Sequence, residues 1–292
     1  NQSSVIVLTG CFPQAFADEA KKIDGIDIIT GTKNRNALPD LVNEFFADNE
    51  KVFSLSEYSK NDVFEPMTNK EFEDKTRAFI KIQDGCNQFC SYCIIPKARG
   101  RIRSKPLKDL KNEVTVLSQS GHKEVVLVGI NLSFYGKEFG LTLADAIDVC
   151  CQTDGIERVR LGSLEPEMIS DEEISRMKNQ PKLCPQFHLS LQSGSSKTLR
   201  AMRRPYTTEQ YAAVAAKLRE AFGEENVSIT TDVIVGFPGE TEQDFEDSMA
   251  FVAGQRFLKV HVFPYSRREG TPAFDFPNQV PEHEKESRSR RM

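Results

Sequence analysis

Residues 79–93 read FIKIQDGCNQFCSYC, a strand-like run followed at once by a loop that carries Cys86, Cys90 and Cys93. Three thiolates can hold three corners of a [4Fe–4S] cube and leave the fourth iron open to a ligand that is not protein. The Cys-x3-Cys-x2-Cys spacing also differs from the ferredoxin spacings, in which the protein ligates every iron. A structural zinc site would need a fourth Cys or His, and the nearest histidine, His122, lies beyond a predicted helix. The loop therefore predicts a cluster with one open iron rather than zinc or three ordinary buried thiols.

The composition limits the class of protein. The chain has 292 residues, 39% of them hydrophobic, enough to bury one large domain and a fragment of another. A net charge of −5 argues against a general polyanion binder, although a local basic face remains compatible with it. No apolar run reaches the length of a membrane span and no signal sequence opens the chain, so we expect no membrane partner. Seven cysteines in a chain too large to depend on disulfides favour the reducing cytoplasm, where clustered cysteines bind metal.

Residues 1–48 have a βαβα pattern. It consists of strand-like runs at 5–9 and 26–30 and helical stretches at 12–22 and 37–48. This is half of a small parallel-sheet domain, and the polar residues 49–75 after it are interpreted as a connector. Cys11 follows the first strand, at the edge where open α/β sheets bind ligands, but a lone cysteine there also suits a small core residue. Because the chain opens on a strand with Asn1 in place of Met, we expect it to be a piece of a longer protein.

Residues 76–292 repeat a strand–helix unit. Strand-like runs lie at 79–83, 124–128, 158–162, 187–191, 228–235 and 257–263, with amphipathic helices at 106–119, 170–178, 208–222 and 241–253. Repeated βα units predict parallel strands joined by right-handed crossovers. Six units are too few to close an ordinary eight-stranded barrel. We therefore predict an α/β fold, an open six-stranded (β/α)6 partial TIM barrel, with its function at the carboxyl ends of the strands.

Residues suited to a polar ligand follow these strands. They are Gly129 and Asn131 after the second strand, Ser163 and Glu165 after the third, Gln192 after the fourth, Gly236 to Glu240 after the fifth and Tyr265 after the sixth. Each alone is compatible with ordinary turn chemistry. Their recurrence at one edge of successive strands favours a binding site beside the cysteine loop. Arg204 is interpreted either as a solvated helix-end cation or as a partner for a ligand carboxylate.

These features resemble the radical S-adenosylmethionine superfamily, and more narrowly its methylthiotransferases. The stretches that carry the resemblance are FIKIQDGCNQFCSYCIIPKARGRIR at 79–103, LGSLEP at 161–166, LQSGS at 191–195, MRRPYT at 202–207, TDVIVGFPGETEQDF at 231–245 and FPYSRREGTPA at 263–273. The resemblance extends from about residue 5 to the last residue. The amino-acid sequence of residues 81–100 and the stretch GINLSFYG at 129–136 are most similar to the branch acting on N6-threonylcarbamoyladenosine at position 37 of tRNA.

The resemblance implies a transferase and its cofactors. A [4Fe–4S] cluster on Cys86, Cys90 and Cys93 would reduce S-adenosylmethionine to give a 5′-deoxyadenosyl radical, which removes hydrogen from C2 of the adenine ring. The implied cofactor contacts are Tyr92 at the adenine, Gly129 and Asn131 at the amino group, Ser163 and Glu165 at the ribose, Gln192 in the pocket and Arg204 at the carboxylate. Asn131 departs from the acidic residue that the superfamily has there. The implied partners are tRNA, an electron donor and a sulfur source.

The resemblance also implies a second [4Fe–4S] cluster in the N-terminal domain, held by three cysteines. Cys11 in the stretch TGC matches the third of these, and the chain begins after the place of the other two. Cys150, Cys151 and Cys184 match none of them and are interpreted as core or surface thiols. The small C-terminal RNA-binding barrel of the family is expected to be missing as well. We therefore expect this chain to hold the radical cluster but not to complete sulfur insertion.

Five cations follow the cysteine loop. They are Lys97, Arg99, Arg101, Arg103 and Lys105. On an extended segment this alternation would aim every charge to one side, which suits RNA phosphates, but a solvated basic edge is an equal alternative. The resemblance favours the contact with tRNA.

Three other functions remain open. Within the superfamily, the substrate could be isopentenyladenosine at position 37 of tRNA or a ribosomal protein. Outside it, the chain could be an iron–sulfur electron carrier or regulator, which would need a cluster ligated entirely by protein and no cofactor pocket.

Overall fold

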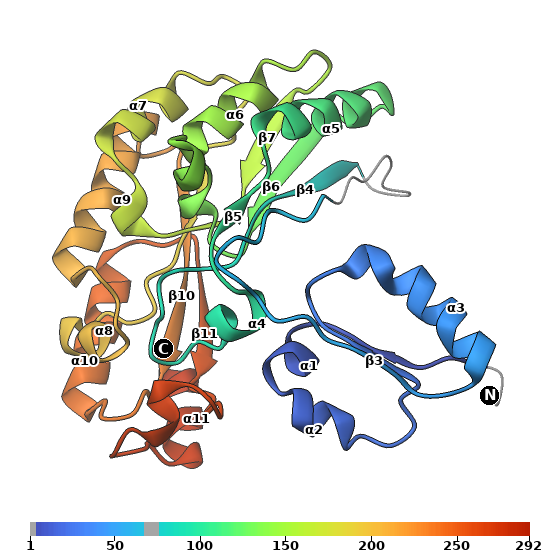
Figure 1. Cartoon of the computed structure of the whole chain (residues 1–292). Helices are drawn as coiled ribbons and strands as arrows, with labels where there is room; N and C mark the ends of the chain where they lie inside the picture. The colour runs from blue at the N-terminus through green and yellow to red at the C-terminus, as the bar shows by residue number, and fades with distance from the viewer. Residues whose placement is uncertain (1–3, 67–75) are drawn as a thin grey trace.

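The computed structural model describes residues 4–66 and 76–292, which form an open barrel with a smaller domain beside it (Figure 1). Within these two ranges no helix is both long and apolar enough to cross a membrane. The expected connector leads from the smaller domain to the barrel, and its residues 67–75 lie outside the described part of the chain.

The smaller domain is a three-stranded parallel sheet with helices packed on it (Figure 1). Its elements are β1 (Val7–Leu8), α1 (Cys11–Ala15), α2 (Ala17–Lys21), β2 (Ile28–Thr30), α3 (Leu38–Asp48) and β3 (Val52–Ser54). Ile28, Leu41 and Val52 form a buried hydrophobic cluster in its core. The βαβα prediction is confirmed with two corrections. The helical stretch breaks at Phe16 into α1 and α2, and β3 continues the sheet into residues expected to be connector.

The barrel wall consists of parallel strands in the order β4, β6, β7/β8, β9, β10 and β11. Their bounds are β4 (Arg77–Asp84), β6 (Glu124–Gly129), β7 (Arg158–Leu161) with its continuation β8 (Ser163–Leu164), β9 (Gln186–Leu189), β10 (Ser228–Val235) and β11 (Lys259–Pro264). This order confirms the open six-stranded barrel. A short strand that the sequence did not predict, β5 (Arg103–Ser104), pairs antiparallel with β4 and borders the open side.

Helices cover the convex face of this wall (Figure 1). They are α5 (Leu107–Gln119), α6 (Leu143–Cys151), α7 (Asp171–Lys178), α8 (Ser196–Ala201), α9 (Thr208–Phe222) and α10 (Glu242–Gly254), with α4 (Ile95–Arg99) in the cysteine loop and α11 (Glu282–Arg291) at the end of the chain. Alternate strand residues such as Ile80, Leu127 and Val233 are buried beneath them in one core. The strand residues that alternate with these buried ones point to the concave face of the wall. Their side chains are therefore available to form a binding site there.

Side-chain caps define the start of several helices, among them α7 and α10. Ser170 accepts a hydrogen bond from the amide of Glu173 at 3.1 Å, and the Glu173 carboxylate accepts from the Ser170 amide, which together form a capping box. Thr241 caps α10 in the same way with Asp244. These caps fix where each helix begins relative to the strand before it.

Candidate active site

The cysteine loop runs from the end of β4 to α4 and is closed at its base by the backbone. The amide of Cys86 donates to the carbonyl of Gly100 at 3.1 Å. Gly85 has a φ of +71°, and a Cβ there would lie 1.9 Å from the carbonyl oxygen of Arg101. A side chain at residue 85 would therefore be strained and would clash with backbone. Glycine is required for the two arms of the loop to approach each other.

A second anchor holds the middle of the loop against the end of α8. Ser91 donates from its amide to the carbonyl of Met202 at 3.0 Å and from its hydroxyl to the carbonyl of Ala201 at 2.8 Å. Arg204 follows closely, so the same anchor fixes the guanidinium relative to the cysteines. Its Nη1 lies 3.2 Å from Sγ of Cys90.

Hydrogen-bond donors surround the thiols. Cys86 Sγ accepts from the amide of Gln88 at 3.4 Å and from Nδ2 of Asn131 at 3.7 Å. Cationic and N–H donors favour the thiolate, which is the form that ligates iron. Burial opposes them, raising the pKa of Cys86 and raising that of Cys93 to about 11. Binding of metal at these sulfurs must therefore release protons.

The donor set fits an iron–sulfur cluster better than a single ion. Ligand atoms around tetrahedral zinc lie roughly 3.8 Å apart for Zn–S bonds of about 2.3 Å. The sulfurs of Cys86, Cys90 and Cys93 do not all lie within 4.8 Å of one another, nor does a fourth Cys, His, Asp or Glu of the described residues complete such a group with them. Three separated thiols without a fourth ligand match a cluster that has one open iron.

Beside Cys86 lies a buried amide and carboxyl network that the sequence did not predict in full. Asn131 donates from its backbone to Oε1 of Gln83 at 2.7 Å and from Nδ2 to Oε1 of Gln88 at 3.3 Å. Gln88 in turn donates to Oε1 of Glu167, whose pKa is raised by burial. The sequence analysis missed Gln88 and Glu167, although each lies within two residues of a predicted site residue.

This network offers two acceptors for a donor-rich group. Oδ1 of Asn131 and Oε2 of Glu167 are buried and have no hydrogen-bond partner among the described residues. Buried acceptors without partners are costly, so a ligand ammonium that donates to both would be favoured. Such a group is part of an amino acid, and it would lie beside the cysteine sulfurs.

The predicted ribose and carboxylate partners are bound to each other. Arg204 is buried and forms an ion pair with Glu165, and its Nε donates to the hydroxyl of Tyr206 at 3.0 Å. The amide of Glu165 donates to the hydroxyl of Ser133 at 2.8 Å. A ligand carboxylate at Arg204 would therefore have to displace Glu165. The predicted partner Ser163 is exposed on the neighbouring β8.

The other predicted cofactor residues also lie at the carboxyl ends of the strands. Tyr92 packs edge-on against the buried ring of Phe237, with ring centroids 6.4 Å apart. Gln192 has a φ of +69°, and its backbone pairs with Asp232 at 2.8 Å. Gly129 packs closely on the Gln83 side chain, since a Cβ there would approach it to 2.9 Å. The predicted pocket residues are thus gathered at one end of the barrel.

Cys11 lies next to the same cysteine loop from the other domain. It begins α1, which packs against α4, and its Sγ accepts from Nε of Arg99 at 3.2 Å. The Thr32 hydroxyl also donates to the carbonyl of Ala98 at 2.6 Å. The two domains therefore meet at the helix that follows Cys93.

The remaining three cysteines lie elsewhere in the barrel. Cys150 and Cys151 are buried in its core at the end of α6, as the interpretation as core thiols required, and Cys184 is half-buried. Burial raises the pKa of Cys151 to about 11.

The basic stretch after the loop is not the extended, one-sided segment that the sequence predicted. Lys97 and Arg99 lie on α4, while Arg103 and Lys105 are buried. Arg103 stacks on the ring of Tyr58 with its guanidinium carbon 4.6 Å from the centroid, and it lies 3.5 Å from Asp84. Lys105 forms an ion pair with Glu113. Burial of Arg103 and Lys105 against acids leaves only part of the predicted basic surface open to solvent.

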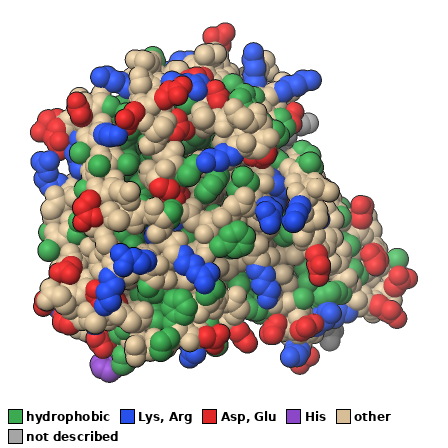
Figure 2. Space-filling view, turned by 60° about the vertical axis from the view of Figure 1, so that its left-hand side comes forward, with side chains coloured by type: hydrophobic (Ala, Val, Ile, Leu, Met, Phe, Trp, Pro, Cys, Tyr) green, Lys and Arg blue, Asp and Glu red, His purple; other side chains and the backbone are tan. Residues whose placement is uncertain are grey.

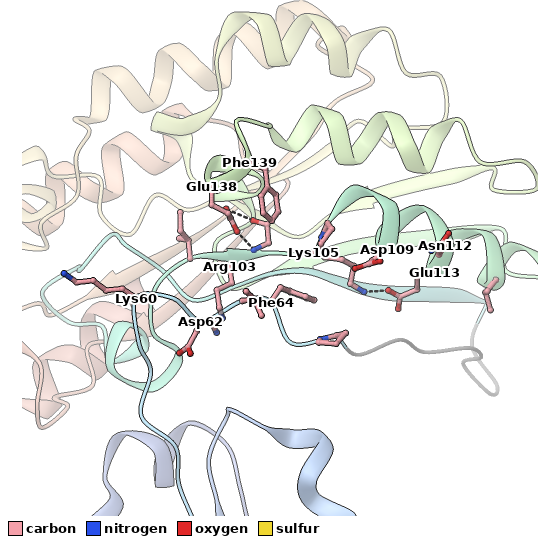
Figure 3. Close-up of a pocket in the computed structure, with 16 residues that line it drawn as sticks. Lys60, Asp62, Phe64, Arg103, Lys105, Asp109, Asn112, Glu113, Glu138 and Phe139 are labelled. Carbon is pink, nitrogen blue, oxygen red and sulfur yellow. Dashed lines mark hydrogen bonds and ion pairs between the residues drawn. The ribbon is translucent and has the colours of Figure 1, made fainter.

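Arg103 and Lys105 line a cavity of about 710 Å³ between the connector and β5, and Phe64 of the connector lines it as well (Figure 3). On the face that Figure 2 shows, Lys and Arg side chains alternate with Asp and Glu. Of the five predicted cations, Lys97 and Arg101 are exposed. These two are the members of the set that remain accessible to a phosphate.

The sequence of this chain is similar to that of known protein families. The sequence model of the Radical SAM superfamily matches residues 80–252. The threonylcarbamoyladenosine tRNA methylthiotransferases MtaB of Thermotoga maritima and Bacillus subtilis are 42% and 38% identical over 99% and 100% of this chain. The tRNA-2-methylthio-N6-dimethylallyladenosine synthase of Clostridium botulinum is 38% identical over 100% of it. The chain spans 65% of the length of each of these curated relatives.

Solved structures share the fold at low sequence identity. The radical S-adenosylmethionine methyltransferase TsrM from Kitasatospora setae, with cobalamin and a [4Fe–4S] cluster bound, has a TM-score of 0.57 at 16% identity, over 67% of this chain and 38% of that one. Coproporphyrinogen III oxidase from Escherichia coli, a radical SAM enzyme, has a TM-score of 0.53 at 15% identity, over 74% and 50% of the two chains.

Proposed function

Because this chain belongs to the radical SAM superfamily, we propose that it is the catalytic part of a tRNA methylthiotransferase. The proposed substrate is N6-threonylcarbamoyladenosine at position 37, and the proposed reaction replaces hydrogen on C2 with a methylthio group. We assign residues 76–292 as the radical SAM core and residues 1–48 as part of the N-terminal methylthiotransferase domain. One observation supports the proposal most strongly. Arg204 and two unpartnered acceptors lie beside the cysteine loop. The chain that has this arrangement is 42% identical to a protein named as a methylthiotransferase.

The proposed cofactor contacts divide by chemical group. Cys86, Cys90 and Cys93 hold the [4Fe–4S] cluster, whose open iron takes the amino and carboxylate groups of S-adenosylmethionine. Oδ1 of Asn131 and Oε2 of Glu167, neither of which has a hydrogen-bond partner among the described residues, accept from the N–H bonds of that amino group. When bound, the cluster and S-adenosylmethionine together supply a 5′-deoxyadenosyl radical.

The rest of the pocket orients the cofactor and excludes water. Tyr92 lies against the adenine, supported by the buried rings of Phe237 and Tyr265. Arg204 binds the cofactor carboxylate and Glu165 the ribose once the two release each other. Gly129, Ser163 and Gln192 shape the strand ends around these groups. The protein therefore positions the cofactor and excludes water from it, while the cofactor carries the radical chemistry.

Cys11 is proposed as one ligand of a second [4Fe–4S] cluster that carries the sulfur to be inserted. Its support is position, because α1 packs on α4 directly after the first cysteine loop. An electron donor and an external sulfur source complete the proposed partners. Lys97 and Arg101, which are exposed and line one surface hollow, are proposed to contact tRNA phosphates.

The second candidate substrate is dimethylallyladenosine in tRNA, because relatives of that name are 38% identical over the whole chain. Full-length protein with reconstituted clusters would be incubated with tRNA carrying either nucleoside, and the digested nucleosides weighed by mass spectrometry. We expect a product heavier by one methylthio group in place of hydrogen only from the threonylcarbamoyl tRNA. A product from the dimethylallyl tRNA alone would replace the proposed substrate, and no product from either would overturn the methylthiotransferase.

A further inference from the structure

Three chemically active side chains meet on the concave face of the barrel, away from the cysteine loop. They are His188 on β9, Asp232 on β10 and His261 on β11, and one potential ligand atom from each lies within 4.8 Å of the other two. The strand register brings them together, since Asp232 pairs with His261 and His188 with Thr230. Two of the four histidines in the chain are used here.

Strand alternation places this triad in the barrel lumen. The neighbours of His188 along β9, Phe187 and Leu189, are fully buried in the core beneath the helices, as is Val233 beside Asp232. Because successive side chains point to opposite faces, His188 and Asp232 point inward. Both are only partly exposed, at 16% and 29% of their side chains.

The hydrogen bonding of His188 leaves one ring nitrogen free. Nδ1 lies 2.9 Å from the Thr230 hydroxyl, and donation of Nδ1–H to that oxygen leaves the lone pair on Nε2. Nε2 lies 3.2 Å from Oδ2 of Asp232, yet it is buried and has no hydrogen-bond partner among the described residues. Two electron-rich atoms so close, and not aligned for a hydrogen bond, call for a cation between them. A metal-ligating imidazole usually donates its other N–H to an oxygen acceptor, a role that the Thr230 hydroxyl can fill here.

The geometry points to a divalent first-row transition metal bound by His188, Asp232 and His261. Bonds of about 2.0–2.2 Å place neighbouring ligand atoms roughly 3 to 3.5 Å apart, a range that includes the 3.2 Å between His188 and Asp232. Two imidazoles and one carboxylate suit Zn²⁺ or Fe²⁺, whereas Mg²⁺ and Ca²⁺ prefer oxygen ligands. Three protein ligands leave at least one coordination position open toward the lumen.

This site adjoins the proposed cofactor site but uses other side chains, since the amide of Gln192 donates to the backbone carbonyl of Asp232 at 2.8 Å. Asp232 precedes Ile234 on the same face of β10, and Ile234 packs against the cluster of Phe237 and Tyr265 beside Tyr92. Two residues along a strand correspond to roughly 6.5 Å, so the triad lies one layer deeper in the barrel than those aromatic rings. The inference therefore does not depend on which nucleoside is modified.

Cobalt titration of the cluster-reconstituted, chelator-treated protein tests the inference. With the cysteine thiols occupied by iron, we expect one equivalent of Co²⁺ to bind with weak d–d absorption and without a thiolate charge-transfer band. His261→Gln and Asp232→Asn should abolish that equivalent, and Thr230→Val, which removes the outer hydrogen bond, should weaken it by about 10- to 100-fold. His283→Gln, at an exposed position on α11, is the matched control and should change nothing.

Two results would overturn the site. One is uptake by the unaltered protein no greater than by His261→Gln, which would mean that His188 and Asp232 share a proton and bind no metal. The other is a new thiolate charge-transfer band in the difference spectrum against the cobalt-free protein, which would place the cobalt on cysteine. Circular dichroism of each variant separates loss of the site from loss of the fold. Zn²⁺ should in addition raise the unfolding temperature of the unaltered protein but not that of Asp232→Asn.

Discussion

Replacing Asp244 with asparagine is expected to lower the free energy of unfolding by about 2 kcal/mol at pH 7. Its carboxylate accepts from Nζ of Lys197 at 2.6 Å, from the amide of Thr241 at 3.0 Å and from the hydroxyl of Ser195 at 3.2 Å. Burial opposes ionisation, but the bonds from Lys197 and Thr241 prevail and lower the pKa from 3.8 to about 2. That difference corresponds to about 2.5 kcal/mol at about 1.4 kcal/mol for each pH unit. Because Lys197 is 63% exposed, water screens its share and we expect somewhat less.

The pH dependence of the unfolding free energy shows whether Asp244 stabilises the fold through its charge or through the packing of its side chain. Since the pKa is lowered by folding, the stabilisation is present above about pH 4 and is lost as pH falls through 2, with about half remaining at pH 3. Urea unfolding of the protein and of Asp244→Asn at pH 7, 5 and 3 measures this. Asp247→Asn, at an exposed position one turn along α10, is the matched control and should cost little. A stability gap for Asp244→Asn that stays constant from pH 7 to pH 3 would refute the electrostatic reasoning.

Three further predictions concern the cysteine loop and its surroundings. Glu167→Gln should weaken S-adenosylmethionine binding about tenfold or more in equilibrium dialysis, because the acceptor for the amino group loses its charge; unchanged affinity would remove Glu167 from the site. Gly85→Ala should prevent assembly of the cluster, seen as loss of its visible absorption, since the added Cβ would lie 1.9 Å from the carbonyl of Arg101. Lys97→Glu combined with Arg101→Glu should reduce the salt slope of tRNA binding by about two, one for each lost phosphate contact. Lys105→Met, at a buried position, should leave that slope unchanged.

The barrel could be predicted from the sequence because its signals are local and repeated. Each strand is a short apolar run with alternating burial, and each following helix has its own apolar face and often its own cap, as at Ser170 and Thr241. The cysteine loop was predictable for the same reason, since its spacing lies within eight residues. In contrast, β3 is three residues long and only Val52 in it is buried, so its pattern could not be told from a polar connector.

The parts that could not be predicted depend on pairs of residues far apart in the chain. Arg204 and Glu165 are separated by 39 residues, and nothing in either stretch indicates that they bind each other. The basic stretch fails for the same reason, because Arg103 meets Asp84 through the pairing of β5 with β4. The proposed metal-binding triad forms only in one register of three neighbouring strands. The apolar pattern does not determine that register, because the inward-facing residues of these strands are partly polar and partly apolar. Local patterns therefore predict where a site lies, and strand register determines which side chains face each other in it.

The ion pair between Arg204 and Glu165 affects which ligands the proposed cofactor site can select. If Arg204 bound a ligand carboxylate without prior pairing, its buried charge would be left uncompensated before binding, at a cost of several kcal/mol. Glu165 compensates that charge, and a ligand carboxylate replaces one anion with another, so no net charge is buried at Arg204. Glu165 is half-buried in this pair. Once displaced, it would need new donors, and the hydroxyl groups of a ribose at the proposed site would supply them. A ligand with a carboxylate but no ribose would leave Glu165 without a partner, and one with a ribose but no carboxylate would not displace it. The pair therefore favours a ligand that carries both groups, as S-adenosylmethionine does.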